Sequence, residues 1–307
     1  MQYAVLFPGQ GSQAVGMGSD VFAARPDLLG SAAEEVLGWP LARTVADGPE
    51  TELMRTDRAQ PALYAISYAL WEAFAARASH PPAAAAGHSL GEYTALAASR
   101  ALDYYDGLRL VAARGAAMAK ATDAADGAMA AVMGADLFDL ESIVASLREQ
   151  GAEIWIANVN APGQIVVAGT TGSVGDLAER SREYGLRRVI PLSVAGAFHT
   201  PLMAPAQSDL SAALAAVELF PGDFPVWSNL EAKPASDVRA SLAGQLTGMV
   251  QFSESLIAMH QAGSEAFVHI GPGDVTAGMA KRTCKQATVI TVSSLDDVDA
   301  AVAALAS

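Results

Sequence analysis

The 307-residue sequence has one cysteine, few basic residues and no long apolar segment. Because a single cysteine cannot form an internal disulfide, we expect a reducing, cytoplasmic location, with Cys284 as buried filler. No stretch approaches the roughly 20 uninterrupted apolar residues of a membrane helix, so we expect no membrane association. The N-terminus has no basic region followed by a cleavage site, so we also expect no export signal.

Basic residues are outnumbered, with 19 Lys and Arg against 33 Asp and Glu and a formal net charge of −14. This balance argues against a nucleic-acid or anionic-membrane partner, unless a polyanion binds locally. The basic residues gather in two clusters, at 180–188 and 281–285. Taken alone, each cluster fits a solvated end of a helix or strand.

The apolar patterns along the chain alternate between strands and helices. Short strand-like runs occur at 3–7, 83–87, 266–270 and 288–292, with helical patterns between them. Such alternation favours a mainly parallel sheet covered by helices. We therefore predict an α/β protein whose large domain is α/β-hydrolase-like.

The middle of the chain follows a different order, β-α-β-β-α-β, which is typical of a ferredoxin-like domain. The predicted elements are strand 127–133, helix 138–149, strands 153–159 and 164–169, helix 173–184 and strand 187–192. We therefore predict a small inserted domain at 122–192. The large catalytic domain is then formed by 1–121 and 193–307.

A G-x-S-x-G motif, Gly87 to Gly91, lies between a small apolar strand and a helix-forming run. In this context the glycines allow a sharp turn that projects the serine hydroxyl, and the following helix N-terminus offers free N–H groups to an oxyanion. Ser89 is therefore the candidate nucleophile, and the alternative is a purely structural turn. A serine hydroxyl also needs a base.

Five histidines could supply that base. His199 is favoured because it lies in a glycine-containing loop between a strand and a proline-started helix, where α/β proteins hold catalytic side chains. His269, near another strand end, is the rival. His80 and His260 fit ordinary surface or packing positions, and His88 fits a packed position because it is the chain neighbour of the nucleophile.

The first strand is followed by Gly9, Gly11 and Ala14, a relaxed form of the dinucleotide-binding loop. Two features oppose that interpretation. The segment 20–37 has a helical pattern, and no strand-terminal acid stands where the ribose partner should be.

Several motifs together resemble the malonyl-CoA:acyl carrier protein transacylases. They occur in the family's order over essentially the whole chain: FPGQGSQ at the start, GHSLGEY around Ser89, LVAARG with Arg114, NAPGQIVVAG at 160–169, GAFHTPLM around His199 and GPG at 271–273. Six motifs with consistent spacing are far more specific than any one of them.

The resemblance implies a role for each matching residue. Ser89 becomes the acylated nucleophile, His199 its base and Arg114 the partner of the malonyl carboxylate. The backbone N–H groups of Gln10 and Leu90 form the oxyanion hole, so the glycines of the first loop serve close backbone approach. From its own surroundings in the sequence, Arg114 would instead be a surface charge on a helix.

The family orients its histidine through a backbone carbonyl, and the resemblance assigns this role to Gln251. The surrounding segment departs from the family, with Met249 in place of a frequent proline and Phe252 in place of a frequent tryptophan. Ala195 replaces a frequent serine in the His199 loop, a change that we expect to matter little.

Phe198 and Leu90 match relatives that select malonyl over methylmalonyl groups. A bulky ring before His199 would crowd an α-methyl group, although one methyl discriminates by only about 1–3 kcal/mol. The alternative for Phe198 is a simple core position.

The implied function is ping-pong transfer of malonyl from malonyl-CoA to an acyl carrier protein, for fatty-acid or polyketide synthesis. It needs no metal and no tightly bound cofactor. Because carrier proteins are generally acidic, the two basic clusters are candidate docking sites. Two other functions stay open: a serine thioesterase or hydrolase of the same turn type, and a non-catalytic carrier-docking module.

Overall fold

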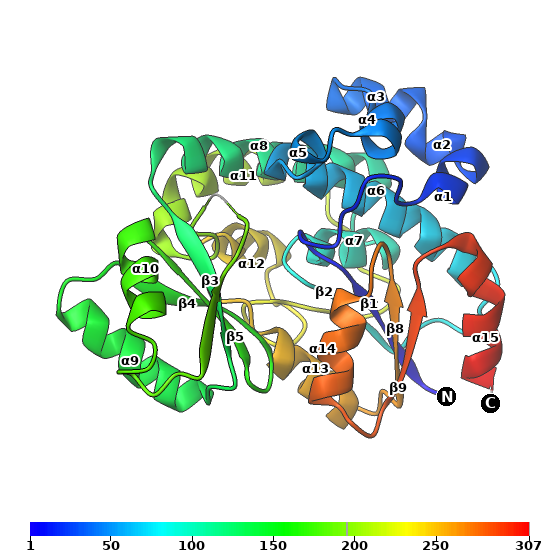
Figure 1. Cartoon of the computed structure of the whole chain (residues 1–307). Helices are drawn as coiled ribbons and strands as arrows, with labels where there is room; N and C mark the ends of the chain where they lie inside the picture. The colour runs from blue at the N-terminus through cyan, green and yellow to red at the C-terminus, as the bar shows by residue number, and fades with distance from the viewer. Residues whose placement is uncertain (195, 307) are drawn as a thin grey trace.

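Five parallel strands form the larger of two sheets in the computed structural model, which describes residues 1–194 and 196–306 (Figure 1). The strand order is β7-β2-β1-β8-β9, and the four predicted strands are confirmed. The prediction missed β7 because it is only two residues long. The strands are β1 (Tyr3–Phe7), β2 (Ala84–Gly87), β7 (Val226–Trp227), β8 (Ala266–Ile270) and β9 (Thr288–Val292).

The two faces of this sheet are covered by different helices. Alternate residues of a strand point to opposite faces, and in β1 Val5 packs in the core with α6, α7 and α8, whereas Leu6 packs in the core with α13 and α14. Strands buried on both faces read as continuous apolar runs, as β1 does. These helices are α6 (Thr56–Ala75), α7 (Gly91–Ala98), α8 (Tyr104–Ala124), α13 (Phe252–Gln261) and α14 (Val275–Thr283).

Shorter helices complete the large part of the fold. The helical pattern predicted over 20–37 divides into three short helices, α1 to α3. Figure 1 shows the C-terminal helix α15 at the sheet edge, close to the N-terminus. The elements are α1 (Ser19–Ala24), α2 (Pro26–Leu29), α3 (Ser31–Leu37), α4 (Leu41–Asp47), α5 (Glu50–Leu53), η1 (Pro201–Met203), α11 (Ala204–Ala215), α12 (Val238–Gln245), η2 (Leu295–Asp297) and α15 (Val298–Ala306).

The second sheet has four antiparallel strands in the order β4-β5-β3-β6, with α9 and α10 packed against it. The predicted β-α-β-β-α-β order is confirmed, although the second helix ends at 179 rather than 184. The elements are β3 (Ala128–Met133), α9 (Leu137–Glu149), β4 (Ile154–Ala161), β5 (Gln164–Gly169), α10 (Thr171–Glu179) and β6 (Arg188–Pro191).

The two sheets are joined by hydrogen bonds through Val250, which follows α12. Its N–H donates to Ala157 O and its carbonyl accepts from Val159 N–H, both at 2.8 Å. The segment between α12 and α13 is thereby held next to β4. Among the described residues, no helix is long and apolar enough to cross a membrane.

Candidate active site

Ser89 stands on the turn between β2 and α7, with a left-handed backbone φ of 52°. The flanking glycines are sterically required. A Cβ on Gly87 would lie 1.8 Å from the carbonyl carbon of Gly91, and one on Gly91 would lie 2.3 Å from Phe7 O. The turn can therefore close only with glycine at both positions, and it leaves Ser89 partly exposed.

His199 contacts the serine hydroxyl directly. Its Nε2 lies 2.8 Å from Ser89 Oγ, and its Nδ1 lies 2.8 Å from Gln245 O. Because a carbonyl only accepts hydrogen bonds, Nδ1 carries the proton and Nε2 is free to accept from the serine. Burial, reinforced by the charge of Arg114, lowers the pKa of His199 to about 3, so the imidazole is neutral near pH 7.

Arg114, on α8, points at the same hydroxyl and is buried rather than at the helix surface. Its Nη2 donates to Ser89 Oγ and to Gln245 Oε1, both at 2.9 Å, and its Nη1 donates to Gln60 Oε1 at 2.7 Å. Within residues 1–194 and 196–306 it forms no ion pair, and its Nε has no hydrogen-bond partner. A buried cation in this state suits an incoming anion.

The loop that contains Gln10 lies against the Ser89 turn. A Cβ on Gly9 would lie 2.4 Å from His88 O, so only glycine permits this approach. Gln10 and Leu90 line the same cleft as Ser89. In the described part of the chain, their N–H groups donate to no other atom, which leaves them available to a ligand.

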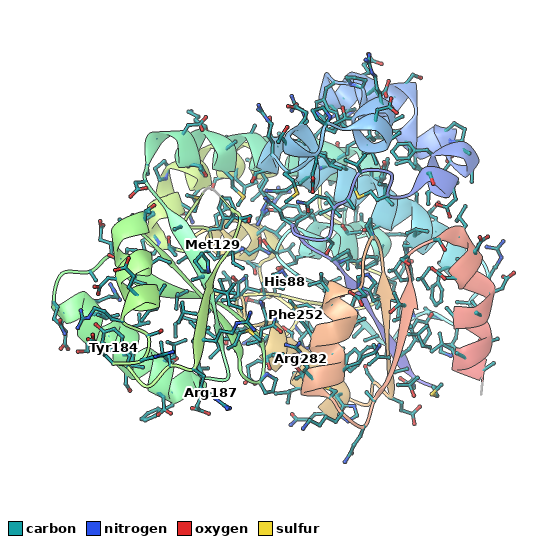
Figure 2. All side chains as sticks on the ribbon, in the orientation of Figure 1. His88, Met129, Tyr184, Arg187, Phe252 and Arg282 are labelled. Carbon is teal, nitrogen blue, oxygen red and sulfur yellow. The ribbon has the colours of Figure 1, made fainter. Side chains whose placement is uncertain are left out.

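The site opens into a cleft of about 340 Å³ between the two sheets. One wall comes from β3, β5 and the segment after β6, and the other from α14 and the Ser89 turn. Its apolar lining includes Met129 (labelled in Figure 2), Val166, Leu192, Phe198 and Met279. The residues that the structure describes include no cluster of three or more His, Cys, Asp or Glu that could hold a metal.

A model of the acyl transferase domain family matches residues 5–305, almost the whole chain. The chain belongs to this family. The malonyl CoA-acyl carrier protein transacylase of Bacillus subtilis (strain 168) is 39% identical to it over 307 residues, covering 98% of this chain and 96% of that protein. The protein of the same name from Staphylococcus aureus (strain MSSA476) is 36% identical and covers 96% of each chain.

Solved structures of acyl transferases match the fold closely. The acyl carrier protein S-malonyltransferase of Vibrio cholerae O1 superposes with a TM-score of 0.92 at 36% identity, covering 98% of this chain and 99% of that one. A malonyl-transacylase in complex with its type II PKS acyl carrier protein gives 0.92 at 34% identity, covering 99% and 100%.

The assignment of the orienting carbonyl to Gln251 is wrong. The carbonyl of Gln251 accepts from Ser255 N–H at 3.1 Å and from Ser255 Oγ at 3.0 Å, within the first turn of α13. The carbonyl at His199 belongs to Gln245, the last residue of α12. The last carbonyls of a helix lack intrahelical partners, so the one at Gln245 is free to accept from the imidazole.

Besides Gln245, other polar residues of this acyl transferase site were not predicted from the sequence, among them Asn229 and Gln60. Asn229 accepts from Ser89 N–H through Oδ1 and donates to Gly87 O through Nδ2, both at 2.7 Å. Gln60 holds Arg114. Neither lies in the G-x-S-x-G motif or another of the matched motifs, so no local signal indicates them.

The remaining sequence candidates occupy distinct places. His88 Nε2 is 2.7 Å from Asn160 Oδ1, and its ring packs edge-on against Phe252 at 5.3 Å (Figure 2). Phe198 is buried and lines the cleft. His269 is bound to Thr276 and Gly271 rather than to Ser89. Ala195 lies outside the described residues.

Replacing His269 by glutamine should reduce the loss of stability in acid. Burial lowers the pKa of His269 to about 4, so the unfolded chain binds a proton that the folded chain does not between the ordinary pKa of histidine, 6.5, and pH 4. In this range wild-type stability falls with falling pH, by about 1.4 kcal/mol per pH unit for one such group.

Urea unfolding at pH 7.5, 6 and 5 measures this slope. Glu92, whose pKa burial raises to about 7, titrates with the opposite sign in an overlapping range. The difference between wild type and His269→Gln therefore isolates the histidine. Equal slopes in the two proteins would contradict the assignment.

Proposed function

We propose that the chain transfers a malonyl group from malonyl-CoA to the phosphopantetheine thiol of an acyl carrier protein, through a malonyl ester of Ser89. The observation that carries this proposal is the buried Arg114 guanidinium, 2.9 Å from Ser89 Oγ and without an ion-pair partner among the described residues. A malonyl group has a free carboxylate one methylene away from the carbonyl that reacts. A guanidinium can bind it through two charge-assisted hydrogen bonds.

The first half-reaction acylates the enzyme. His199 Nε2 takes the proton of Ser89 Oγ as the oxygen attacks the thioester carbonyl. The N–H groups of Gln10 and Leu90 stabilise the resulting oxyanion. The C–S bond then breaks, and the coenzyme A sulfur leaves with the proton from His199.

The second half-reaction reverses these roles. The carrier's thiol gives its proton to His199 and attacks the carbonyl of the malonyl-Ser89 ester. When the tetrahedral intermediate collapses, the bond to Ser89 Oγ breaks and His199 returns the proton to that oxygen. The residues of this chain suffice for both steps, with malonyl-CoA entering as substrate.

Phe198 is proposed to disfavour an α-methyl group on the acyl chain. Its ring lies at the cleft wall, on the residue before His199. A Cβ on Gly196 would lie 2.7 Å from the ring, so glycine at this position leaves the space that the ring occupies. Such a contact discriminates by about 1–3 kcal/mol per methyl group.

A serine hydrolase is the less favoured alternative. It would need a side-chain acid to orient His199, and the atom at His199 Nδ1 is the main-chain oxygen of Gln245. A non-catalytic docking module is less favoured too, because Ser89, His199 and Arg114 are in hydrogen-bond contact.

Intact-protein mass spectrometry tests the proposed function. Brief exposure to malonyl-CoA should give an adduct that maps to the peptide containing Ser89, and a pantetheinylated carrier should then remove it. Acetyl-CoA, in parallel, should label much more slowly. An adduct lost to water at the same rate without the carrier would indicate a hydrolase, and no adduct would indicate a docking module.

The two basic clusters are proposed to bind the acidic carrier at the mouth of the cleft. Arg187 passes close to Gly134, whose N–H donates to Gly163 O at 2.7 Å. The next residue, Gln164, begins β5, lines the cleft and accepts from Arg282 Nη1 at 2.7 Å. Figure 2 labels both arginines: Arg187 directly precedes β6, and Arg282 is on α14.

Charge reversal at Arg187 and Arg188, or at Lys281 and Arg282, should raise the apparent KM for the carrier without changing hydrolysis of malonyl-CoA. The reason is the loss of local attraction in a protein of net charge −14. Arg77→Glu, at an ion pair with Asp299 on α15, is the matched control. Unchanged KM values in both double variants would refute the docking site.

We also propose a cytoplasmic location, because Cys284 is a buried free thiol.

We propose that the chain is divided into two domains, with 122–192 as the inserted domain and 1–121 with 193–307 as the large one. This division is supported by the two sheets, each of which takes all its strands from one of these parts.

A further inference from the structure

No acidic side chain among the described residues contacts Ser89 or His199 directly. An acid, Glu92, instead contacts Gln245, the residue whose main-chain oxygen binds His199. Glu92 is on α7, three residues after Ser89, and only 3% of it is exposed. Its Oε2 accepts from Gln245 Nε2 at 2.7 Å and from the Asn229 main-chain N–H at 3.0 Å. The acid thus joins helix α7 to the end of α12 and to the loop after β7.

Gln245 connects Glu92 to His199 and Arg114. Its main-chain oxygen accepts from His199 Nδ1, and its Oε1 accepts from Arg114 at 2.9 Å. Its Nε2 also lies 3.1 Å from Ser89 O. Because Glu92 Oε2 accepts from Gln245 Nε2, the amide is held with its nitrogen toward Glu92 and its oxygen Oε1 toward Arg114.

Asn229 is the second element held by Glu92. While its own N–H is bound to the carboxylate, its side chain connects Ser89 N–H and Gly87 O, on the two sides of the sharp turn. Glu92 therefore holds both the backbone of the Ser89 turn, through Asn229, and the residue that accepts from His199, which is Gln245.

We propose that Glu92 is a positioning residue of the transfer reaction. It holds Gln245 and Asn229 against α7, and these two residues in turn align His199, Arg114 and the Ser89 backbone. This role presupposes the proposed function. Glu92 is not a catalytic residue, because the groups it contacts lie between it and the reacting atoms.

The role depends on an acceptor oxygen that lies within hydrogen-bond distance of both donors, and it does not depend on the charge of Glu92. Both observed bonds go to the same oxygen, which a glutamine at this position can reproduce with its amide oxygen. Aspartate keeps the charge but is one methylene shorter, so it cannot reach both donors from the same backbone. Burial raises the pKa of Glu92 to about 7, so the wild-type group is itself partly neutral near physiological pH.

The test compares Glu92→Gln with Glu92→Asp in single-turnover acylation by malonyl-CoA and acetyl-CoA. We expect Glu92→Gln to stay within about 3-fold of wild type. Glu92→Asp should lose about 10- to 100-fold with malonyl-CoA, since small misplacements of catalytic groups have effects of that size. Ser255→Ala, which removes a partly buried hydrogen bond to Gln251 O, is the matched structural control.

A second readout is the ¹H–¹⁵N NMR signal of His199 Nδ1–H, which reports the bond to Gln245 O. It should persist in Glu92→Gln and in Ser255→Ala, and shift or broaden in Glu92→Asp. Gln245→Met should lower the malonyl-to-acetyl rate ratio, and adding Glu92→Asp to it should lower that ratio little further, because both changes act through one contact. If Glu92→Asp does not fold, the malonyl-to-acetyl rate ratio of Gln245→Met tests the proposal.

Three results would overturn the proposal. One is the reverse order of the two Glu92 variants, which would indicate a charge effect. Another is a loss of thermal stability with unchanged acylation and an unchanged His199 signal, which would indicate a purely structural role. The third is an unchanged rate ratio in Gln245→Met. Absence of a Ser89 adduct in the wild-type protein would instead refute the proposed function.

Discussion

Replacing His199 by alanine is expected to lower the rate of Ser89 acylation by about 10²–10⁴-fold, the usual contribution of a positioned general base. His199 Nε2 is 2.8 Å from Ser89 Oγ, and the bond from Nδ1 to Gln245 O leaves Nε2 as an acceptor. Among the residues that the structure describes, no other acceptor contacts Ser89 Oγ. The neighbouring Arg114 only donates to the hydroxyl.

Rapid-quench labelling by malonyl-CoA measures this rate directly. His269→Gln is the matched control, because His269 is also buried but is bound to Thr276 and Gly271. It should acylate at the wild-type rate. If His269→Gln lost activity and His199→Ala kept it, the serine would have a different base and the hydrolase hypothesis would return.

Replacing Arg114 by alanine is expected to reverse the preference between substrates. Loss of charge-assisted hydrogen bonds worth about 1.5–3 kcal/mol should lower malonyl transfer by about 10- to 150-fold. Acetyl-CoA has no carboxylate to place, so its transfer should change much less. The ratio of the two acylation rates is the quantity to compare, since Arg114 also contacts Ser89 Oγ.

Arg114→Lys separates charge from geometry. Lysine keeps a positive charge but cannot bind a carboxylate with two parallel N–H groups, so its malonyl-to-acetyl ratio should lie between those of wild type and Arg114→Ala. Equal losses for the two substrates in Arg114→Ala would show that the arginine supports the serine rather than the malonyl carboxylate.

Local sequence patterns were sufficient where the chain itself determines the geometry. The Ser89 turn requires glycine at Gly87 and Gly91 because side chains there would overlap neighbouring backbone, so its motif reports its shape. The strand runs and the β-α-β-β-α-β order likewise follow from periodicity, and the structure confirms them. The short β7 has no such period.

The carbonyl at His199 shows where such patterns are insufficient. Both Gln245 and Gln251 lie in the segment 245–252, and motif matching assigned the wrong one. The choice depends on where α12 ends and α13 begins, since a carbonyl at the end of a helix is free whereas one at the start is bound within the first turn.

The sequence by itself determined the fold class, the Ser89 turn and the family resemblance, because the strand and helix patterns, the turn and each of the motifs are formed by residues close together in the chain. Only the tertiary structure decided that Arg114 is buried with no ion pair among the described residues, and that Glu92, Asn229 and Gln245 form one network around Ser89. These contacts join residues as far as 156 positions apart. No local pattern encodes them, since they exist only when β2, α8 and α12 pack together.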